Sequence, residues 1–145
     1  MPAITLAQAN EIIRHALARS RKLKTKPLGV AVVDESGNII SAQRDDGASM
    51  FRIDVGAGKA WAAVAIGFSS REVGRRAKAN PTFFISLAST GHGKFIPQTG
   101  AVLITDDQGK VLGAAGASGA AADEDEGCCI WGIEKAGFKV GVDPV

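Results

Sequence analysis

Two cations of this sequence have the type and the surroundings of anchors for an anion. Arg44 ends an apolar stretch, and Lys59 lies among alanines and glycines that offer an ammonium group no obvious partner. A guanidinium matches a carboxylate with a planar fork, whereas an ammonium acts as a point charge. We therefore predict that Arg44 and Lys59 bind an anionic ligand. The alternative is that they form ion pairs with Asp45, Asp46 or Asp125 that only fix the local fold.

Two acids nearer the C-terminus, Asp125 and Glu126, have the chemistry of a general acid or base. They belong to a run of four acids at positions 123–126 that precedes an apolar segment, which is typical of the first turn of a helix. General acid or base catalysis would need one of these carboxyls to be desolvated and its pKa to be raised. We therefore predict Asp125, Glu126 and Lys59 as catalytic residues. The alternative is that the acids only complement the helix dipole.

A glycine-rich stretch, Gly116-Ala-Ser-Gly119, connects the apolar run 110–115 to these acids. Glycine tolerates a positive φ and lets the backbone approach a ligand closely. The order predicts a strand, a tight turn and a helix, with the N–H groups of the turn facing a pocket. Gly116, Ser118 and Gly119 are therefore predicted to bind a ligand. A strand-to-helix corner without any ligand would have the same sequence.

The cysteines and histidines do not have the spacing of a zinc site, and we predict no metal centre. Cys128 and Cys129 are neighbours that cannot easily bridge to each other; they are either activated thiols near a helix start or, more commonly, small buried apolar side chains. Of the two histidines, His92 in a Gly-His-Gly loop is the better candidate for a metal ligand, because His15 is expected on the polar face of a helix. Pro2 could act as an N-terminal base, but a capped helix follows it where such enzymes have a strand.

The composition is that of one globular domain, residues 1–145, with a net charge of +2. Only residues 19–26 are strongly basic, and they fall at a predicted helix end, where cations complement the dipole. We therefore expect no nucleic-acid surface. Because the sequence has no bilayer-spanning apolar run and no signal pattern, we expect no membrane contact and a cytoplasmic location.

Hydrophobic periodicity and turn signals predict alternating helices and hairpins. A capping box at Thr5 and Gln8 opens the first helix, and a second one at Ser69 and Glu72 opens a short basic helix. The segment 45–49 is expected to cap the helix that follows it. The predicted helices are 6–23, 50–67, a short one ending before Pro81, 82–88 and 123–135, with a short strand as the alternative for 82–88. The predicted hairpin strands are 28–33 with 39–44 and 100–104 with 110–115. Together they predict an α+β domain with a largely antiparallel sheet.

Several short motifs, taken in this order, resemble those of the GlcG/HbpS family, also called the haem-degrading domain family. The motifs are Val32-Val-Asp34 with Gly37, Arg44-Asp-Asp-Gly-Ala48, Lys59-Ala60, Pro97 with Gly100, and Gly116-Ala-Ser-Gly119 with Asp125-Glu126. The chain departs from the family pattern in residues 94–101, where a Gly-Gly-Val-Pro-like approach is usual, and in the extra acids Asp123 and Glu124.

The resemblance implies a profilin-like α+β fold, a five-stranded antiparallel sheet with helices on both faces, and a homo-oligomer. The family includes haem-binding proteins, a domain fused to corrinoid adenosyltransferases, and proteins encoded near small-molecule catabolic enzymes. Our first hypothesis is an enzyme or a binding protein that holds an organic acid or related metabolite between Arg44, Lys59, Pro97 and the Gly116–Glu126 corner. The alternatives are a haem-binding or haem-degrading protein, with His92, His15 or a non-histidine group as the haem ligand, and an accessory oligomer without catalysis.

Composition also favours self-association into a dimer or a higher oligomer. Gly56, Gly58 and the alanines of the helix 50–67 would give a smooth surface on which a second helix could pack closely. Trp61 and Trp131 are large side chains that need cover.

Overall fold

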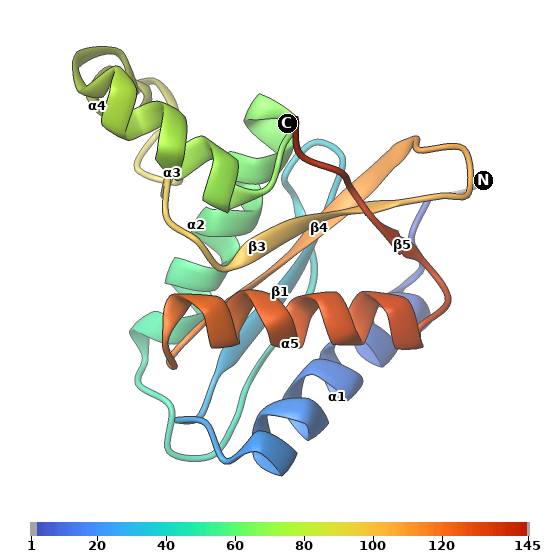
Figure 1. Ribbon diagram of the computed structural model, residues 1–145. Helices are drawn as coiled ribbons and strands as arrows, with labels where there is room; N and C mark the ends of the chain where they lie inside the picture. The colour runs from blue at the N-terminus through green and yellow to red at the C-terminus, as the bar shows by residue number, and fades with distance from the viewer. Residues whose placement is uncertain (1–2, 145) are drawn as a thin grey trace.

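The computed structural model describes residues 3–144, so Pro2 lies outside the described residues. It contains a single five-stranded sheet with helices against it (Figure 1). The helices are α1 (Leu6–Leu23), α2 (Phe51–Ile66), α3 (Ser70–Ala79), α4 (Pro81–Thr90) and α5 (Ala122–Lys135), and the strands are β1 (Gly29–Asp34), β2 (Ile39–Arg44), β3 (Ala101–Thr105), β4 (Val111–Ser118) and β5 (Lys139–Val140). No helix among the described residues is long and apolar enough to span a membrane.

The sheet has the strand order β2-β1-β4-β3-β5, and every neighbouring pair is antiparallel. Strand β4 is central, and it pairs with β1 from Asp34 opposite Gly113 to Gly29 opposite Ser118. Almost every residue of β1, β3 and β4 is buried, because helices cover both faces of the sheet. The predicted five-stranded antiparallel α+β fold is confirmed.

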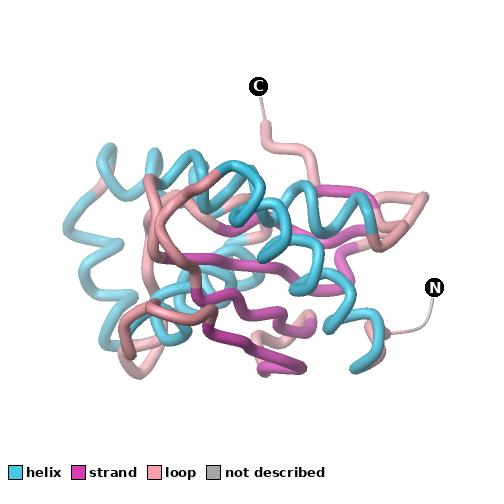
Figure 2. Tube along the Cα trace, turned by 90° about the horizontal axis from the view of Figure 1, so that it is seen from below, coloured by secondary structure: helices cyan, strands magenta, loops and turns pink. Residues whose placement is uncertain are grey.

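The helices form two layers. Helices α1 and α5 pack on one face of the sheet over the larger core, whereas α2 lies on the other face over a smaller core (Figures 1 and 2). Helices α3 and α4 continue from α2, and α4 projects beyond the sheet with no buried residue. The end of β4 therefore lies between the starts of α2 and α5.

Local signals placed most helix starts correctly. Thr5 and Gln8 form the predicted capping box of α1, and the N–H of Glu72 donates to Ser69 Oγ at the start of α3. The second capping box is incomplete, because the Glu72 carboxylate accepts from Arg75 and Arg76 instead of returning to the N-cap. The expectation that residues 45–49 cap α2 is wrong: the N-cap is Met50, without a side-chain hydrogen bond.

The glycines of α2 pack against the sheet of the same chain. A Cβ on Gly56 would lie 2.9 Å from the Gly116 carbonyl oxygen, and one on Gly116 would lie 2.1 Å from the Gly56 oxygen. Gly58 lies as closely against Ile96. These intramolecular contacts account for the glycines without a second subunit, so self-association remains an expectation from the family resemblance.

We predict that Gly116→Ala destabilises the fold, because the added methyl group would force α2 away from β4. Overpacking of this kind costs about 1–3 kcal/mol, which lowers the melting temperature by several degrees in a chain of this size. Gly127→Ala is the matched control. Gly127 lies within α5 with open space around its Cβ position, so alanine should stabilise that helix by about 1 kcal/mol. Thermal unfolding of both variants tests the close contact; equal melting temperatures would contradict it.

Candidate functional site

The end of β4 and the start of α5 form a corner that gathers several of the predicted site residues. Gly119, with a φ of 139°, makes the corner, and a Cβ there would lie 2.2 Å from the Pro27 oxygen. The predicted tight turn over Gly116–Gly119 is wrong in its extent, because β4 continues to Ser118 in register with β1. The N–H of Ala117 donates to the Gly100 oxygen, so it does not face a pocket.

A buried ion pair lies at this corner. Lys59 of α2 donates from Nζ to the Ala117 oxygen at 3.0 Å and lies 3.4 Å from Asp125 Oδ2 of α5. The other oxygen, Oδ1, accepts from the Ala120 N–H at 3.0 Å. Burial raises the pKa of Asp125 above its ordinary value, and the Ala120 N–H and the Lys59 charge only partly oppose this shift. The lysine that was predicted as an anion anchor is thus already bonded to an internal acid.

The second cation at the corner is Arg52, which the sequence analysis missed. Its Nη1 donates to Ser118 Oγ at 3.1 Å. Arg44 lies two strands away, opposite Gly29, and it is exposed, with no hydrogen-bond or ion-pair partner in the described part of the chain. The spacing of Arg52, Gly56 and Lys59 places them on one face of a helix, and that spacing could have pointed to Arg52.

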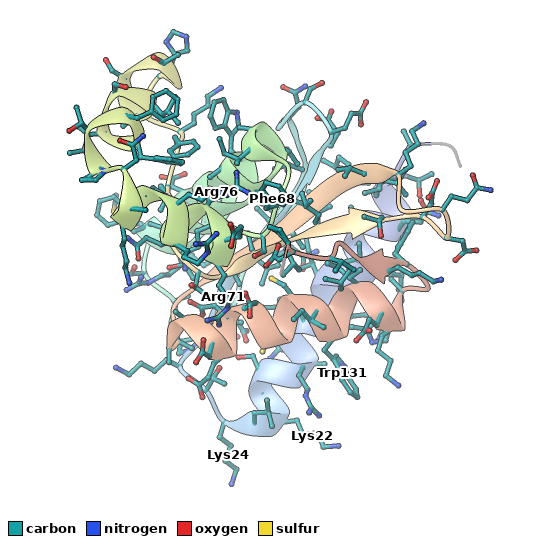
Figure 3. The ribbon with its side chains drawn as sticks, turned by 45° about the horizontal axis from the view of Figure 1, so that its top comes forward. Lys22, Lys24, Phe68, Arg71, Arg76 and Trp131 are labelled. Carbon is teal, nitrogen blue, oxygen red and sulfur yellow. The ribbon has the colours of Figure 1, made fainter. Side chains whose placement is uncertain are left out.

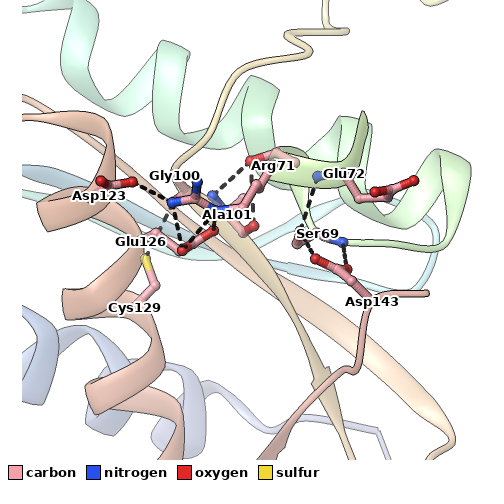
Figure 4. A network of polar contacts seen from close by, with 10 residues as sticks. Ser69, Arg71, Glu72, Gly100, Ala101, Asp123, Glu126, Cys129 and Asp143 are labelled. Carbon is pink, nitrogen blue, oxygen red and sulfur yellow. Dashed lines mark hydrogen bonds and ion pairs between the residues drawn. The ribbon is translucent and has the colours of Figure 1, made fainter. Parts of the chain in front are cut away.

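Glu126 is the residue after Asp125 in α5, and its carboxylate accepts hydrogen bonds from the Arg71 guanidinium of α3 (Figure 4). The same guanidinium donates to Asp123, and the two carboxylates raise the pKa of Arg71. Of the three predicted catalytic residues, the structure therefore brings Lys59 and Asp125 into contact, and it places Glu126 in a separate ion pair. This pairing joins α3 to α5, which are far apart in the sequence.

The cysteines are buried apolar residues in this structure. Burial raises the pKa of Cys128 to about 11 and raises that of Cys129 further, with nearby Asp125 adding to both shifts. The alternative of an activated thiol therefore does not apply. No group of three potential metal ligands occurs among residues 3–144.

The two histidines lie apart. His92 is exposed in the loop after α4, with a positive φ of 55°. His15 is partly buried on α1, and its Nε2 lies 3.4 Å from Glu11.

Pro97 is the predicted ligand-binding residue that lines a surface hollow. A hollow of about 600 Å³ lies between α3 and residues 97–99, and an apolar hollow of about 280 Å³ continues from it along α4. Ala77, Pro81 and Pro97 line both hollows. We call the two together the α3–α4 groove.

Residues 4–134 match the family model described as "Haem degrading protein HbpS-like". The chain belongs to the HbpS-like family. Among HbpS-like structures, HbpS itself is 25% identical, with a TM-score of 0.81 over 94% of this chain and 92% of that chain. A double mutant of HbpS from Streptomyces reticuli is 26% identical, with a TM-score of 0.81 over 94% of this chain and 89% of that chain.

Two further structures share the fold at lower identity. PduOC, solved as a heme complex, is 23% identical with a TM-score of 0.84, over 97% of this chain and all of that chain. The protein ORFY of Klebsiella pneumoniae is also 23% identical, with a TM-score of 0.83 over 94% and 92%. A comparison with curated protein sequences gives no match.

We predict that Lys59 and Asp125 are strongly coupled in stability. Lys59→Met leaves a buried carboxylate and Asp125→Leu leaves a buried ammonium, and removing one partner of such a pair costs about 3–5 kcal/mol. The double variant should recover part of this loss, because no buried charge remains. Denaturant unfolding of the four proteins measures the coupling energy. Single-variant effects that simply add would contradict the buried ion pair.

Proposed function

We propose that this chain binds an anionic small molecule with a flat apolar body in the α3–α4 groove, and that haem is the first candidate. The observation that carries the proposal is the continuity of a cationic hollow with an apolar one. Arg71, Arg75 and Lys78 line the first, and Phe84, Ile85 and Phe95 line the second. Together the two hollows, of about 600 and 280 Å³, have a volume within the range of about 300–1,000 Å³ that is typical of a ligand site.

The charges of α3 support an anionic ligand. The helix carries four cations, Arg71, Arg75, Arg76 and Lys78, against the single acid Glu72. Arg71 and Arg75 are bonded to carboxylates, and Arg76 both bonds to Glu72 and covers the Phe68 ring (Figure 3). Lys78 has no hydrogen-bond or ion-pair partner among residues 3–144, so its ammonium is available to a ligand.

Haem has three chemical parts, which are its carboxylates, its macrocycle and its iron, and the groove matches the first two. The carboxylates suit the cationic hollow, in which Lys78 is available, and the macrocycle suits the apolar hollow beside Phe84 and Phe95. Neither histidine lines the groove. The description of the family and the heme complex of PduOC support haem as the member of this ligand class to test first. When bound, haem would supply redox or ligand-binding chemistry at its iron.

A haem titration followed by Soret absorbance tests the proposal. We expect a saturable band in the wild type and a loss of affinity of about tenfold or more, equivalent to about 1.4 kcal/mol, for Lys78→Glu and for Ala77→Phe. The first variant removes the free cation, and the second fills the point where the two hollows meet. Lys22→Glu is the matched control, because Lys22 lies at the far end of the molecule from α3 (Figure 3).

Unchanged affinity in both groove variants would overturn the proposed site, and a wild type without a saturable Soret band would overturn haem as the ligand. The spectra of His15→Ala and His92→Ala then show whether either imidazole binds the iron. A shifted Soret maximum in one of these variants identifies the histidine ligand.

A second candidate is a small organic acid at the Gly119 corner. In this proposal Lys59, Arg52 and Ser118, which meet at the corner, bind the acid, and Asp125 serves as the acid or base. The predicted ligand residues Arg44 and Pro97 and the predicted catalytic residue Glu126 lie elsewhere and take no part in it. The observation in its favour is the raised pKa of buried Asp125 next to Lys59, because such carboxyls cluster at functional sites. A carboxylate that raises the melting temperature of the wild type, but not that of Arg52→Ala, would support it.

A further inference from the structure

A separate hollow of about 510 Å³ lies on the outer side of α2. Three segments line it: Asp54, Ala57, Gly58 and Trp61 of α2, residues 37–39 at the end of the β1–β2 turn and the start of β2, and residues 93–94 after α4. It shares no lining residue with the α3–α4 groove. Residues of three separate parts of the chain thus meet around one space of the size of a small-molecule site.

The Trp61 indole is held in a fixed position at this hollow. A Cβ on Gly37 would lie 2.6 Å from Trp61 Cδ1, and one on Gly91 would lie 3.0 Å from the opposite edge of the ring. Phe95 meets the indole edge-on, with ring centroids 6.3 Å apart. The Nε1–H has no hydrogen-bond partner among the described residues, yet it is not a buried atom, so it is open to solvent. The indole offers a rigid apolar wall with one free donor.

Two opposite charges line the same hollow without pairing. Neither the Asp54 carboxylate nor the Lys94 ammonium has a hydrogen-bond or ion-pair partner in the part of the chain that the structure describes, and they do not bond to each other. Many other charged side chains, such as Arg71, Glu72 and Asp45, are engaged in ion pairs. A carboxylate, an ammonium and an indole around one space match a ligand that carries both charges and an apolar group.

We propose that this hollow is a second binding site, for an amino acid with a flat apolar side chain. The ligand's ammonium group meets Asp54, its carboxylate meets Lys94, and its side chain lies against Trp61 and the exposed Ile39. The proposal goes beyond the groove described above and does not depend on it, because the two sites lie in different hollows.

Fluorescence of a Trp131→Phe variant tests the proposal, because Trp61 is then the only tryptophan. The probe is L-phenylalanine, which does not fluoresce at tryptophan wavelengths. We expect a saturable change in Trp61 emission and a weaker response to 2-phenylethylamine and to 3-phenylpropionate, each of which lacks one charge. Asp54→Asn and Lys94→Gln, made in the same background, should each weaken L-phenylalanine binding about tenfold to a hundredfold, since a charged hydrogen bond is lost.

Glu134→Gln and Lys22→Gln are the matched controls, because they remove the same charges from α5 and α1, and we expect them to leave the binding unchanged. Melting temperatures of all variants confirm that they fold. No saturable change in Trp61 emission would overturn the site. Binding that is as strong in Asp54→Asn and Lys94→Gln as in their parent would overturn the roles of the two charges. Haem binding to the groove is measured on the same proteins, so failure of this site is distinguishable from failure of the groove.

Discussion

The buried pair of Lys59 and Asp125 is the constraint on which the arrangement of the domain depends. It connects α2, on one face of the sheet, with α5, on the other, past the end of β4. Either charge alone would be too costly to bury, so both helices must keep the register that brings the groups together. The same pair explains a glycine at position 100, where a Cβ would lie 2.6 Å from the Lys59 Nζ. Gly56 and Gly116 then allow α2 to lie close enough to β4 for Lys59 to reach across.

This internal pairing determines where charge remains for a ligand. Lys59 and Arg52 are bonded within the chain, and so are the three arginines of α3. Among residues 3–144, Lys78 is therefore the cation of α3 whose side chain has no hydrogen-bond or ion-pair partner. The α3–α4 groove and the hollow of about 510 Å³ beside Trp61 both border one small apolar cluster, which contains Phe95 with Trp61 and Phe84 packed against it. A single cluster therefore provides a wall of each site, through Trp61 in one and through Phe84 and Phe95 in the other.

Local sequence signals predicted most of the fold, whereas the site depended on contacts between distant segments. The Thr5 capping box and the turns between strands are specified by their own residues, so they could be predicted from the sequence. Small residues continue without interruption from β4 towards Gly119, and this is why the end of the strand was placed too early. The glycines of α2 indicated a close neighbour but not which one. The partners of Glu126 and Ser118 could not be predicted, because Arg71 and Arg52 reach them only once the sheet has formed.

The most direct test of the central pair is the titration of the Asp125 carboxyl, followed by the ¹³C chemical shift of its side chain with Asp125→Asn for assignment. If the carboxyl is desolvated against Lys59 as described, its pKa lies above the ordinary value of 3.8. The pKa of Asp125 should also rise further when Lys59 is replaced by methionine, since the positive charge that lowers it is lost. A pKa at or below 3.8 that does not respond to Lys59→Met would show a solvated, unpaired carboxyl. That result would contradict the buried pair that joins α2 to α5.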